Sequence, residues 1–186
     1  QYLPTAMDSK MSFRVGSQLD LLDRVPDISC RRLALTALEE GDKAAYNALC
    51  LDDARNRWWG YDYREDLHGE LTEDYFLSVA REDFRRRMAV NWAVRLDGRL
   101  IGEAVLYNHD WRGGMELGCR IAPEFAGHGY GTEAFAAAAD WALYRLGLKQ
   151  VVAKCFREND SSRRMLESCM RQTGEDEKFL YFRKVE

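Results

Sequence analysis

The sequence predicts an α/β fold in which helices flank a mixed, mostly antiparallel sheet. Residues 89–96 and 114–121 alternate as half-buried strands do, and residues 100–107 read as the hairpin partner of 89–96. A glycine-rich stretch then leads into an Ala-rich helical segment at 135–146. The next apolar run, 150–156, suits a buried parallel strand. These observations predict an antiparallel meander followed by a strand–helix–strand unit.

The glycine-rich stretch contains Gly127, Gly129 and Gly131 at alternate positions. Glycine lets the backbone approach a ligand closely, and a helix N-terminus offers unpaired N–H groups with partial positive charge. A glycine loop that opens a helix therefore predicts a phosphate site, although a merely flexible loop would have the same composition. The spacing differs from the dinucleotide fingerprint, and the loop lacks the Lys-Ser/Thr of a P-loop.

The N-terminal half supplies the remaining helices of the predicted fold. Residues 1–30 are expected to form an arm of unassigned structure, followed by a single domain over 31–186. Residues 31–36 read as a strand and 39–51 as a helix. Residues 72–84 read as a second helix with Thr72 as its N-cap.

The elements after the Ala-rich helix are shorter. Gly147 is placed to end that helix. Residues 161–170 read as a helix capped by Asp160 or Ser161, and 179–184 read as the last strand. We expect that last strand to form a sheet edge, which would support a homodimer.

The composition limits the class of protein. A chain of 186 residues favours one domain, and a formal net charge of −4 gives no reason to expect nucleic acid or an anionic membrane as partner. Five widely spaced cysteines, without a Cys-x-x-Cys motif, favour reduced thiols in a cytoplasmic protein. Three isolated histidines give no metal-site pattern, and no apolar run has the length of a membrane span.

Three linked motifs give the chain a family resemblance. Residues 127–132 resemble the pyrophosphate loop of the GNAT superfamily of N-acetyltransferases, with Gly129 and Gly131 at its two small positions. Residues 116–124 read Glu-Leu-Gly-Cys-Arg-Ile-Ala-Pro-Glu, and 159–167 read Asn-Asp-Ser-Ser-Arg-Arg-Met-Leu-Glu. Both stretches are similar to motifs of the branch that acetylates ribosomal-protein N-termini. The resemblance implies the GNAT fold, whose fourth and fifth strands are parallel and splay apart.

The resemblance also implies where acetyl-CoA, the co-substrate, binds. Pantetheine would pair with the strand backbone, and pyrophosphate would lie on the glycine loop. The implied contacts are Cys119, Arg120, Ile121, Gly127, His128, Gly129, Tyr130, Gly131, Thr132, Asn159 and Ser162. Ala126 stands where the family has Gln or Arg, so the phosphate contact of that side chain is missing. Asn159 can equally be a loop or capping residue.

Glu116 is the candidate catalytic residue. An alkylamine is protonated at neutral pH, so a carboxylate is a sensible general base, and Glu116 matches the strand glutamate of the family. It can equally be an exposed strand carboxylate or an ion-pair partner. Leu166 stands where many members have a tyrosine acid, so no general acid is assigned. Cys119 and Cys155 have no histidine at a motif-linked position and are interpreted as small buried apolar residues.

Four aromatic residues form a cluster at 58–63. Trp58, Trp59, Tyr61 and Tyr63 either pin a long loop as a small satellite core or line the acceptor site, and different rings can do each. The resemblance places this loop between the first two helices, at the border of the acceptor site.

The sequence therefore predicts an N-acetyltransferase that moves the acetyl group of acetyl-CoA to a primary amine, with no metal. The amine can be a protein N-terminus, a lysine or a small molecule, because acceptor choice depends on loops that sequence does not decode. The alternative is a catalytically weak acyl-CoA-binding module with a regulatory or scaffolding role.

Overall fold

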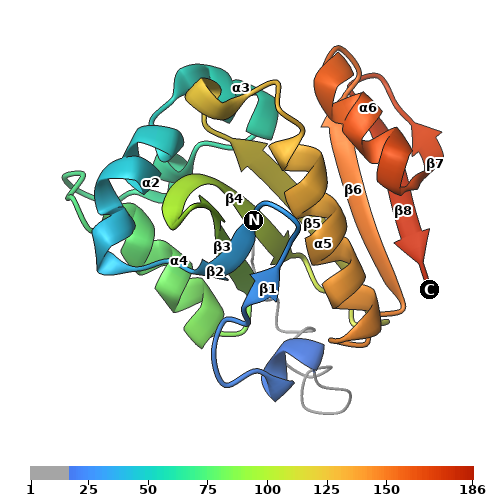
Figure 1. Cartoon of the computed structure of the whole chain (residues 1–186), viewed down its shortest axis with the longest axis horizontal. Coiled ribbons are helices and arrows are strands. Elements are labelled where there is room, and N and C mark those ends of the chain that lie inside the picture. Colours follow the sequence, from blue (N-terminus) through green and yellow to red (C-terminus); the bar gives the residue numbers. More distant parts are fainter. Residues whose placement is uncertain (1–16) are drawn as a thin grey trace.

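A computed structural model describes residues 17–186 (Figure 1), and these form one eight-stranded sheet with helices on both faces. The strand order is β1-β2-β3-β4-β5-β6-β8-β7, and only the β5–β6 pair is parallel. The strands are β1 (Ile28–Ser29), β2 (Ala34–Ala37), β3 (Ala89–Leu96), β4 (Arg99–Tyr107), β5 (Gly114–Ile121), β6 (Gln150–Phe156), β7 (Arg171–Glu175) and β8 (Phe179–Val185). The predicted fold class is confirmed.

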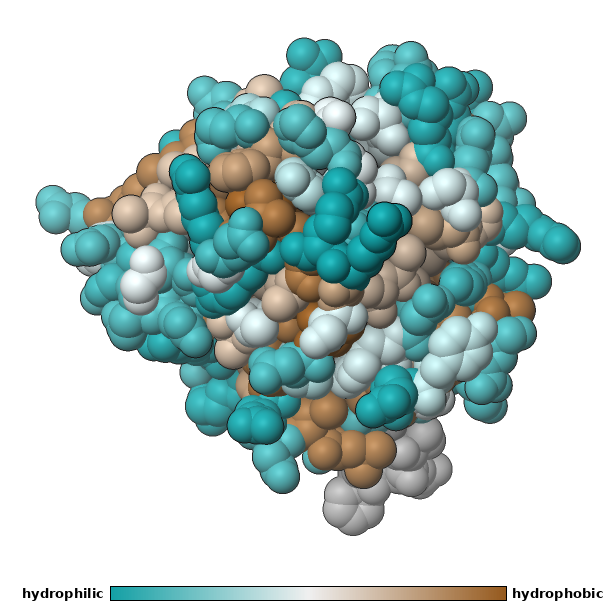
Figure 2. All heavy atoms as spheres, in the orientation of Figure 1, coloured by the Kyte–Doolittle hydropathy of each residue, from teal (hydrophilic) through white to brown (hydrophobic). Residues whose placement is uncertain are grey.

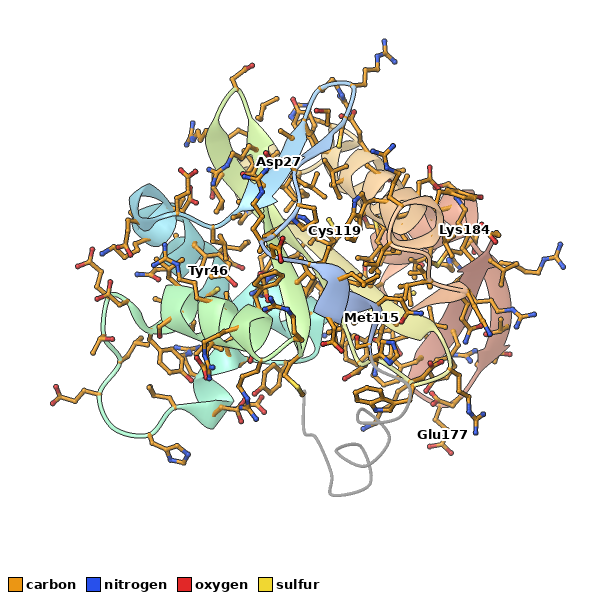
Figure 3. All side chains as sticks on the ribbon, turned by 90° about the horizontal axis from the view of Figure 1, so that it is seen from below. Asp27, Tyr46, Met115, Cys119, Glu177 and Lys184 are labelled. Carbon is orange, nitrogen blue, oxygen red and sulfur yellow. The ribbon has the colours of Figure 1, made fainter. Side chains whose placement is uncertain are left out.

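The helices divide between the two faces of the sheet (Figures 1 and 3). Helices α2, α3 and α4 cover one face, and α5 and α6 cover the other. The α-helices are α2 (Lys43–Cys50), α3 (Asp53–Trp59), α4 (Tyr75–Arg85), α5 (Tyr130–Tyr144) and α6 (Asp160–Cys169). The 3₁₀ helices are η1 (Gln18–Leu21), η2 (Glu40–Asp42), η3 (Tyr63–Asp66) and η4 (Pro123–Phe125).

Strand alternation builds a separate apolar cluster on each face. Trp92 and Val94 of β3 pack into the larger cluster under α5, whereas Ala93 between them packs into the smaller cluster under α2 and α4. In Figure 3, the labelled Tyr46 lies on the α2–α4 side and Cys119 on the α5 side. Hydrophilic side chains cover most of the face drawn in Figure 2, with hydrophobic residues showing near its middle.

The sheet opens between β5 and β6. These strands pair only at Gly114↔Gln150, Met115↔Val151 and Glu116↔Val152. Beyond Glu116, β5 continues to pair with β4 as far as Ile121, and β6 continues to pair with β8. The two strands therefore separate after Glu116, which produces the splay that the resemblance implied.

Residues 17–30, which the sequence left unassigned, pack with the rest of the chain. Leu19 of η1 is fully buried in the larger cluster, and Ile28 of β1 pairs with Leu35 of β2. The domain that the structure describes therefore begins before residue 31. The first sixteen residues of the expected arm lie outside the described residues.

Two predicted helix caps are wrong. Helix α4 begins at Tyr75 rather than Thr72, whose carbonyl only accepts a turn hydrogen bond from the Tyr75 N–H at 3.2 Å. Helix α6 begins at Asp160, and the cap is Asn159, whose Oδ1 accepts from the Ser162 N–H at 3.2 Å. Asn, Asp and Ser all favour this position, so their run at 159–161 leaves the cap ambiguous in the sequence.

The predicted sheet edge at 179–184 is also wrong. Strand β8 lies between β6 and β7, and the edge is β7, which the sequence analysis did not find. All five residues of β7 are exposed, so the strand has no apolar alternation to reveal it. Residues 179–184 therefore do not provide the free edge on which the expected homodimer depended.

Candidate functional site

A cavity lies where β5 and β6 separate, and we call it the splay cavity. It measures about 840 Å³, counting its open part, and residues from both sheet faces line it because the strands part there. Its lining residues are Trp58, Trp59, Tyr61, Tyr63, Tyr107, Glu116, Leu117, Gly118, Cys119, Phe135, Ala153, Lys154, Cys155, Phe156, Ser162, Met165, Leu166 and Phe179.

A second cavity, the glycine-loop cavity, adjoins the first. It measures about 1180 Å³ on the same basis and lies between α3, the end of β5, the glycine loop and α6. Its lining residues are Arg55, Trp58, Trp59, Cys119, Arg120, Ile121, Phe125, Ala126, Gly127, Gly129, Tyr130, Gly131, Thr132, Asn159, Ser161, Ser162 and Met165. The two cavities share five wall residues, so one extended ligand can occupy both.

The glycine loop presents helix amides to this cavity. Gly127 (φ 81°) and Gly129 (φ 78°) lie in the left-handed region, where a side chain is strained. Gly129 is the N-cap of α5, and the first helical bond runs from the Glu133 N–H to the Gly129 carbonyl. The amides of residues 130–132 thus have no partner within the helix and, with the helix dipole, suit an anion.

His128 differs from the other predicted loop contacts. Its side chain is exposed and is not part of the cavity wall, and its ring packs on Tyr130 with centroids 5.5 Å apart. Its carbonyl accepts a hydrogen bond from Arg32 Nη1 at 3.0 Å. The same arginine donates from Nε to Glu133 at 2.8 Å and lies over the Tyr130 ring. Arg32 therefore fastens the loop to the start of α5, a role that the sequence did not reveal.

Arg55 is a second cation that sequence reasoning missed. It lies on α3 and lines the glycine-loop cavity, as Ala126 does. Its buried Nε makes no hydrogen bond with residues 17–186, and the Asp52 carboxylate lies 3.8 Å away. Arg55 is thus available to an anionic ligand.

Asn159 and Ser162, the predicted cofactor contacts at the start of α6, hydrogen-bond to each other. Asn159 caps α6 through Oδ1, and its Nδ2 donates to Ser162 Oγ at 2.9 Å. Both residues still line the glycine-loop cavity. The capping interpretation of Asn159 is therefore correct, and its cofactor contact stays a prediction.

Glu116 lies at the point of the splay, on the α2–α4 face. It is half-buried and lines the splay cavity. Its carboxylate accepts a hydrogen bond from the Tyr107 hydroxyl at 2.7 Å and a longer one from Asn108 Nδ2 at 3.3 Å. Tyr107 is its cross-strand neighbour in β4, and only the strand register reveals this pair. The carboxylate makes no ion pair within residues 17–186 and faces the cavity.

A second glutamate on the same face is committed to a buried network. Glu103 is fully buried and forms a 2.8 Å ion pair with Arg120, its cross-strand partner. Tyr46 and Tyr63 hydroxyls also donate to Glu103, at 2.8 and 3.1 Å. Burial alone would lower the pKa of Arg120, but Glu103 raises it overall, so the guanidinium stays charged. The Arg120 side chain is therefore structural, and only its backbone remains a candidate for cofactor pairing.

The aromatic cluster packs within the domain and lines the cavities, and its contact with an acceptor stays a prediction. Trp58 and Trp59 end helix α3 rather than lying in a loop, which corrects the prediction. Trp59 lies over the Arg120 guanidinium at 4.7 Å and occupies the space beside Gly118, where an added Cβ would approach its ring to 2.9 Å. Both tryptophans line both cavities, whereas Tyr61 and Tyr63 line only the splay cavity of the two.

The thiols near the site are poor nucleophiles. Burial, with a contribution from Glu103, raises the pKa of Cys119 to about 12, and burial also raises the pKa of Cys155. Leu166 is buried in the wall at the position where the resemblance would place a tyrosine. Within residues 17–186, no three His, Cys, Asp or Glu side chains gather as a metal site, and no helix combines the length and apolar character needed to span a bilayer.

Comparisons with known sequences found a matching family and a relative. The model of the acetyltransferase (GNAT) domain family matches residues 32–169. The uncharacterized N-acetyltransferase YoaA of Bacillus subtilis (strain 168) is 24% identical over 147 residues, which cover 76% of this chain and 80% of that protein.

Solved structures share the fold. Spermidine N-acetyltransferase from Vibrio cholerae, in complex with CoA and spermine, superposes with a TM-score of 0.70 at 19% identity, covering 83% of this chain and 95% of that one. RimL, a ribosomal L7/L12 alpha-N-protein acetyltransferase, gives a TM-score of 0.70 at 14% identity, covering 87% and 95%.

Proposed function

The chain belongs to the GNAT family of acetyltransferases, and from this premise we propose that it transfers the acetyl group of acetyl-CoA to a primary amine in the splay cavity. The observation that carries the proposal is the end of β5–β6 pairing at Glu116, where a cavity with helix amides meets a cavity with a carboxylate. The acceptors named for the two similar structures, spermidine and a protein α-amine, are both amines.

Acetyl-CoA would occupy the glycine-loop cavity with its pyrophosphate on the amides of residues 130–132. Arg55 would add a charge-assisted contact that replaces the side chain missing at Ala126. Arg32 would hold the loop in shape from outside. The pantetheine arm would pass along the freed backbone of Cys119 to Ile121 and bring the thioester into the splay.

The amine would approach from the α2–α4 face, where Glu116 and Tyr107 lie. Glu116 would take a proton from the ammonium, directly or through water, and the freed nitrogen lone pair would attack the thioester carbonyl carbon. The new C–N bond forms as the C–S bond breaks, and the thiolate leaves as coenzyme A. The proton that the nitrogen loses in this step passes to water or to the thiolate.

Release of free thiol from acetyl-CoA across a panel of primary amines tests the proposal. We expect amine-dependent thiol release that requires both substrates, and mass spectrometry should find an acetyl group on the amine nitrogen. Tight CoA binding without thiol release for any amine would instead support the acyl-CoA-binding module, which the buried Leu166 keeps as the second candidate.

A further inference from the structure

A third cavity, which we call the α4 cavity, lies on the same face as Glu116 but outside the splay. It measures about 1110 Å³, counting its open part, between α4, η3 and β3. It adjoins the splay cavity because Tyr61 and Tyr63 line both. The reaction proposed above does not use it.

Asn91 gives this cavity an unsatisfied acceptor. The residue is only 6% exposed, it lies on β3, and it lines the α4 cavity. Its Oδ1 is buried and has no hydrogen-bond partner among residues 17–186. A buried acceptor without a donor is costly, and such atoms in native proteins usually have a ligand or water as partner. This atom therefore calls for a ligand that carries an N–H or O–H group.

The charges and rings in the cavity wall specify the ligand further. Asp66 and Asp83 contribute carboxylates, and Arg86 contributes the one cation among the described lining residues, which together carry a formal net charge of −1. Burial raises the pKa of Asp83 to about 6, with Arg86 opposing the shift and Asp66 and Glu82 adding to it, so the carboxylate is ionised at neutral pH.

Five aromatic side chains complete the wall: Tyr46, Tyr61, Tyr63, Tyr75 and Phe76. Rings of this kind attract a cation over their faces. The carboxylates and the rings match a ligand with a positive charge, and the unpaired Asn91 acceptor matches an N–H donor. The aromatic wall also suits an alkyl body.

We propose that the α4 cavity is a binding site for an alkylammonium group. Because this cavity shares a wall with the splay cavity, the alkylammonium group would be the far end of an acceptor whose reacting amine lies in the splay cavity. The acceptor class would then be diamines and polyamines. A separate amine molecule is the other source of the same group. The choice of the acceptor as source rests on the proposed function, whereas the site itself does not.

Binding is tested first with a probe that cannot form a stable amide. N,N,N′,N′-tetramethyl-1,4-diaminobutane is doubly charged at neutral pH and keeps one N–H on each nitrogen. In calorimetry with the full chain, we expect Asp83→Asn to weaken its binding about tenfold or more. Arg86→Gln should strengthen binding, because it removes the opposing charge. These opposite shifts are not expected from general damage to the fold.

Asn91→Leu separates binding from stability. It removes an acceptor that has no partner in the part of the chain that the structure describes, so the thermal midpoint should rise by about 2–4 °C. Probe affinity should fall in the same variant. Equal probe affinity in wild type, Asp83→Asn and Asn91→Leu would overturn the proposal, as would no detectable binding to the wild type.

Kinetics then identify the source of the alkylammonium group. We compare kcat/KM for α,ω-diamines of three to eight carbons with that for monoamines of equal length. A preference for diamines of one length, lost in Asp83→Asn while monoamine rates stay constant, assigns the site to the acceptor. Equal kcat/KM values, with monoamine turnover changed by the tertiary diamine, assign it to a separate amine. No thiol release with any amine, while the probe still binds, would refute the proposed function and leave the site in place.

Discussion

Replacing Arg120 with methionine should make the stability of this protein depend on pH in a defined way. Arg120 is the only cation within 4 Å of Glu103 in the described part of the chain, and the Glu103 side chain has no exposed surface. Methionine fills much of the same volume without charge. Glu103 would keep only the Tyr46 and Tyr63 hydroxyls as donors.

The cost follows from proton uptake by the isolated carboxylate. A buried carboxylate without its cation is expected to bind a proton, and a glutamate in the unfolded chain titrates near pH 4.3. At pH 7, holding that proton costs about 1.36 × (7.0 − 4.3), or about 3.7 kcal/mol, which is an upper limit for the charge effect. Because the folded variant binds one more proton than the unfolded chain, its deficit should shrink by about 1.4 kcal/mol per pH unit as the pH falls.

Urea denaturation between pH 4.5 and 7.5 measures this deficit against the wild type. The Glu103→Gln/Arg120→Met double variant is the control, since it has no carboxylate at position 103 and its deficit should stay constant with pH. It should also be more stable than Arg120→Met at pH 7. A single-variant deficit that is equal at pH 5 and pH 7 would refute this account of the buried pair.

Three further changes test the candidate site. Glu116→Gln should lower kcat about a hundredfold at neutral pH, with a deficit that shrinks as the pH rises and more amine arrives neutral; a pH–rate profile checks this, and a constant deficit would mean that Glu116 only positions the acceptor. Gly129→Asp should weaken CoA binding in calorimetry at least tenfold, because it places a side chain at φ 78° and a carboxylate beside the phosphate-binding amides; unchanged affinity in the folded variant would rule that loop out. Trp59→Ala should raise KM for both amine and acetyl-CoA several-fold, because Trp59 lines both cavities; a change for the amine alone would mean that its ring contacts only the acceptor.

Local patterns determined the parts of this protein that depend on neighbours along the chain. Strand β5 begins and ends at the predicted residues, 114 and 121, because the side chains of a strand alternate between faces with a period of two. The turn between β3 and β4 also depends on local residue types, since Asp97 (φ 50°) and Gly98 (φ 82°) tolerate the positive φ angles of a two-residue hairpin. Glycine spacing before an Ala-rich segment likewise predicted α5, although the helix begins at Tyr130, before the predicted segment at 135–146.

Elements that are held by distant contacts could not be read this way. Strand β7 is wholly exposed and polar, so only its pairing with β8 makes it a strand. The Trp58–Trp59 pair seemed to lie in a loop, but a short helix capped by Asp52 carries it. Propensity is a weak prior for such short elements, and tertiary contacts decide them.

Within the candidate site, the sequence alone identified Glu116, the glycine loop and the aromatic cluster, because their residue types have suitable chemistry. Only the tertiary structure decided what each one contacts. The register of β4 against β5 gives Tyr107 to Glu116 and Arg120 to Glu103, and therefore leaves one carboxylate facing a cavity and buries the other in an ion pair. Arg32 reaches Glu133 across 101 positions of sequence. Periodicity reports which face a residue takes, but cross-strand register and long-range packing determine its partner, and the partner determines what the residue can do.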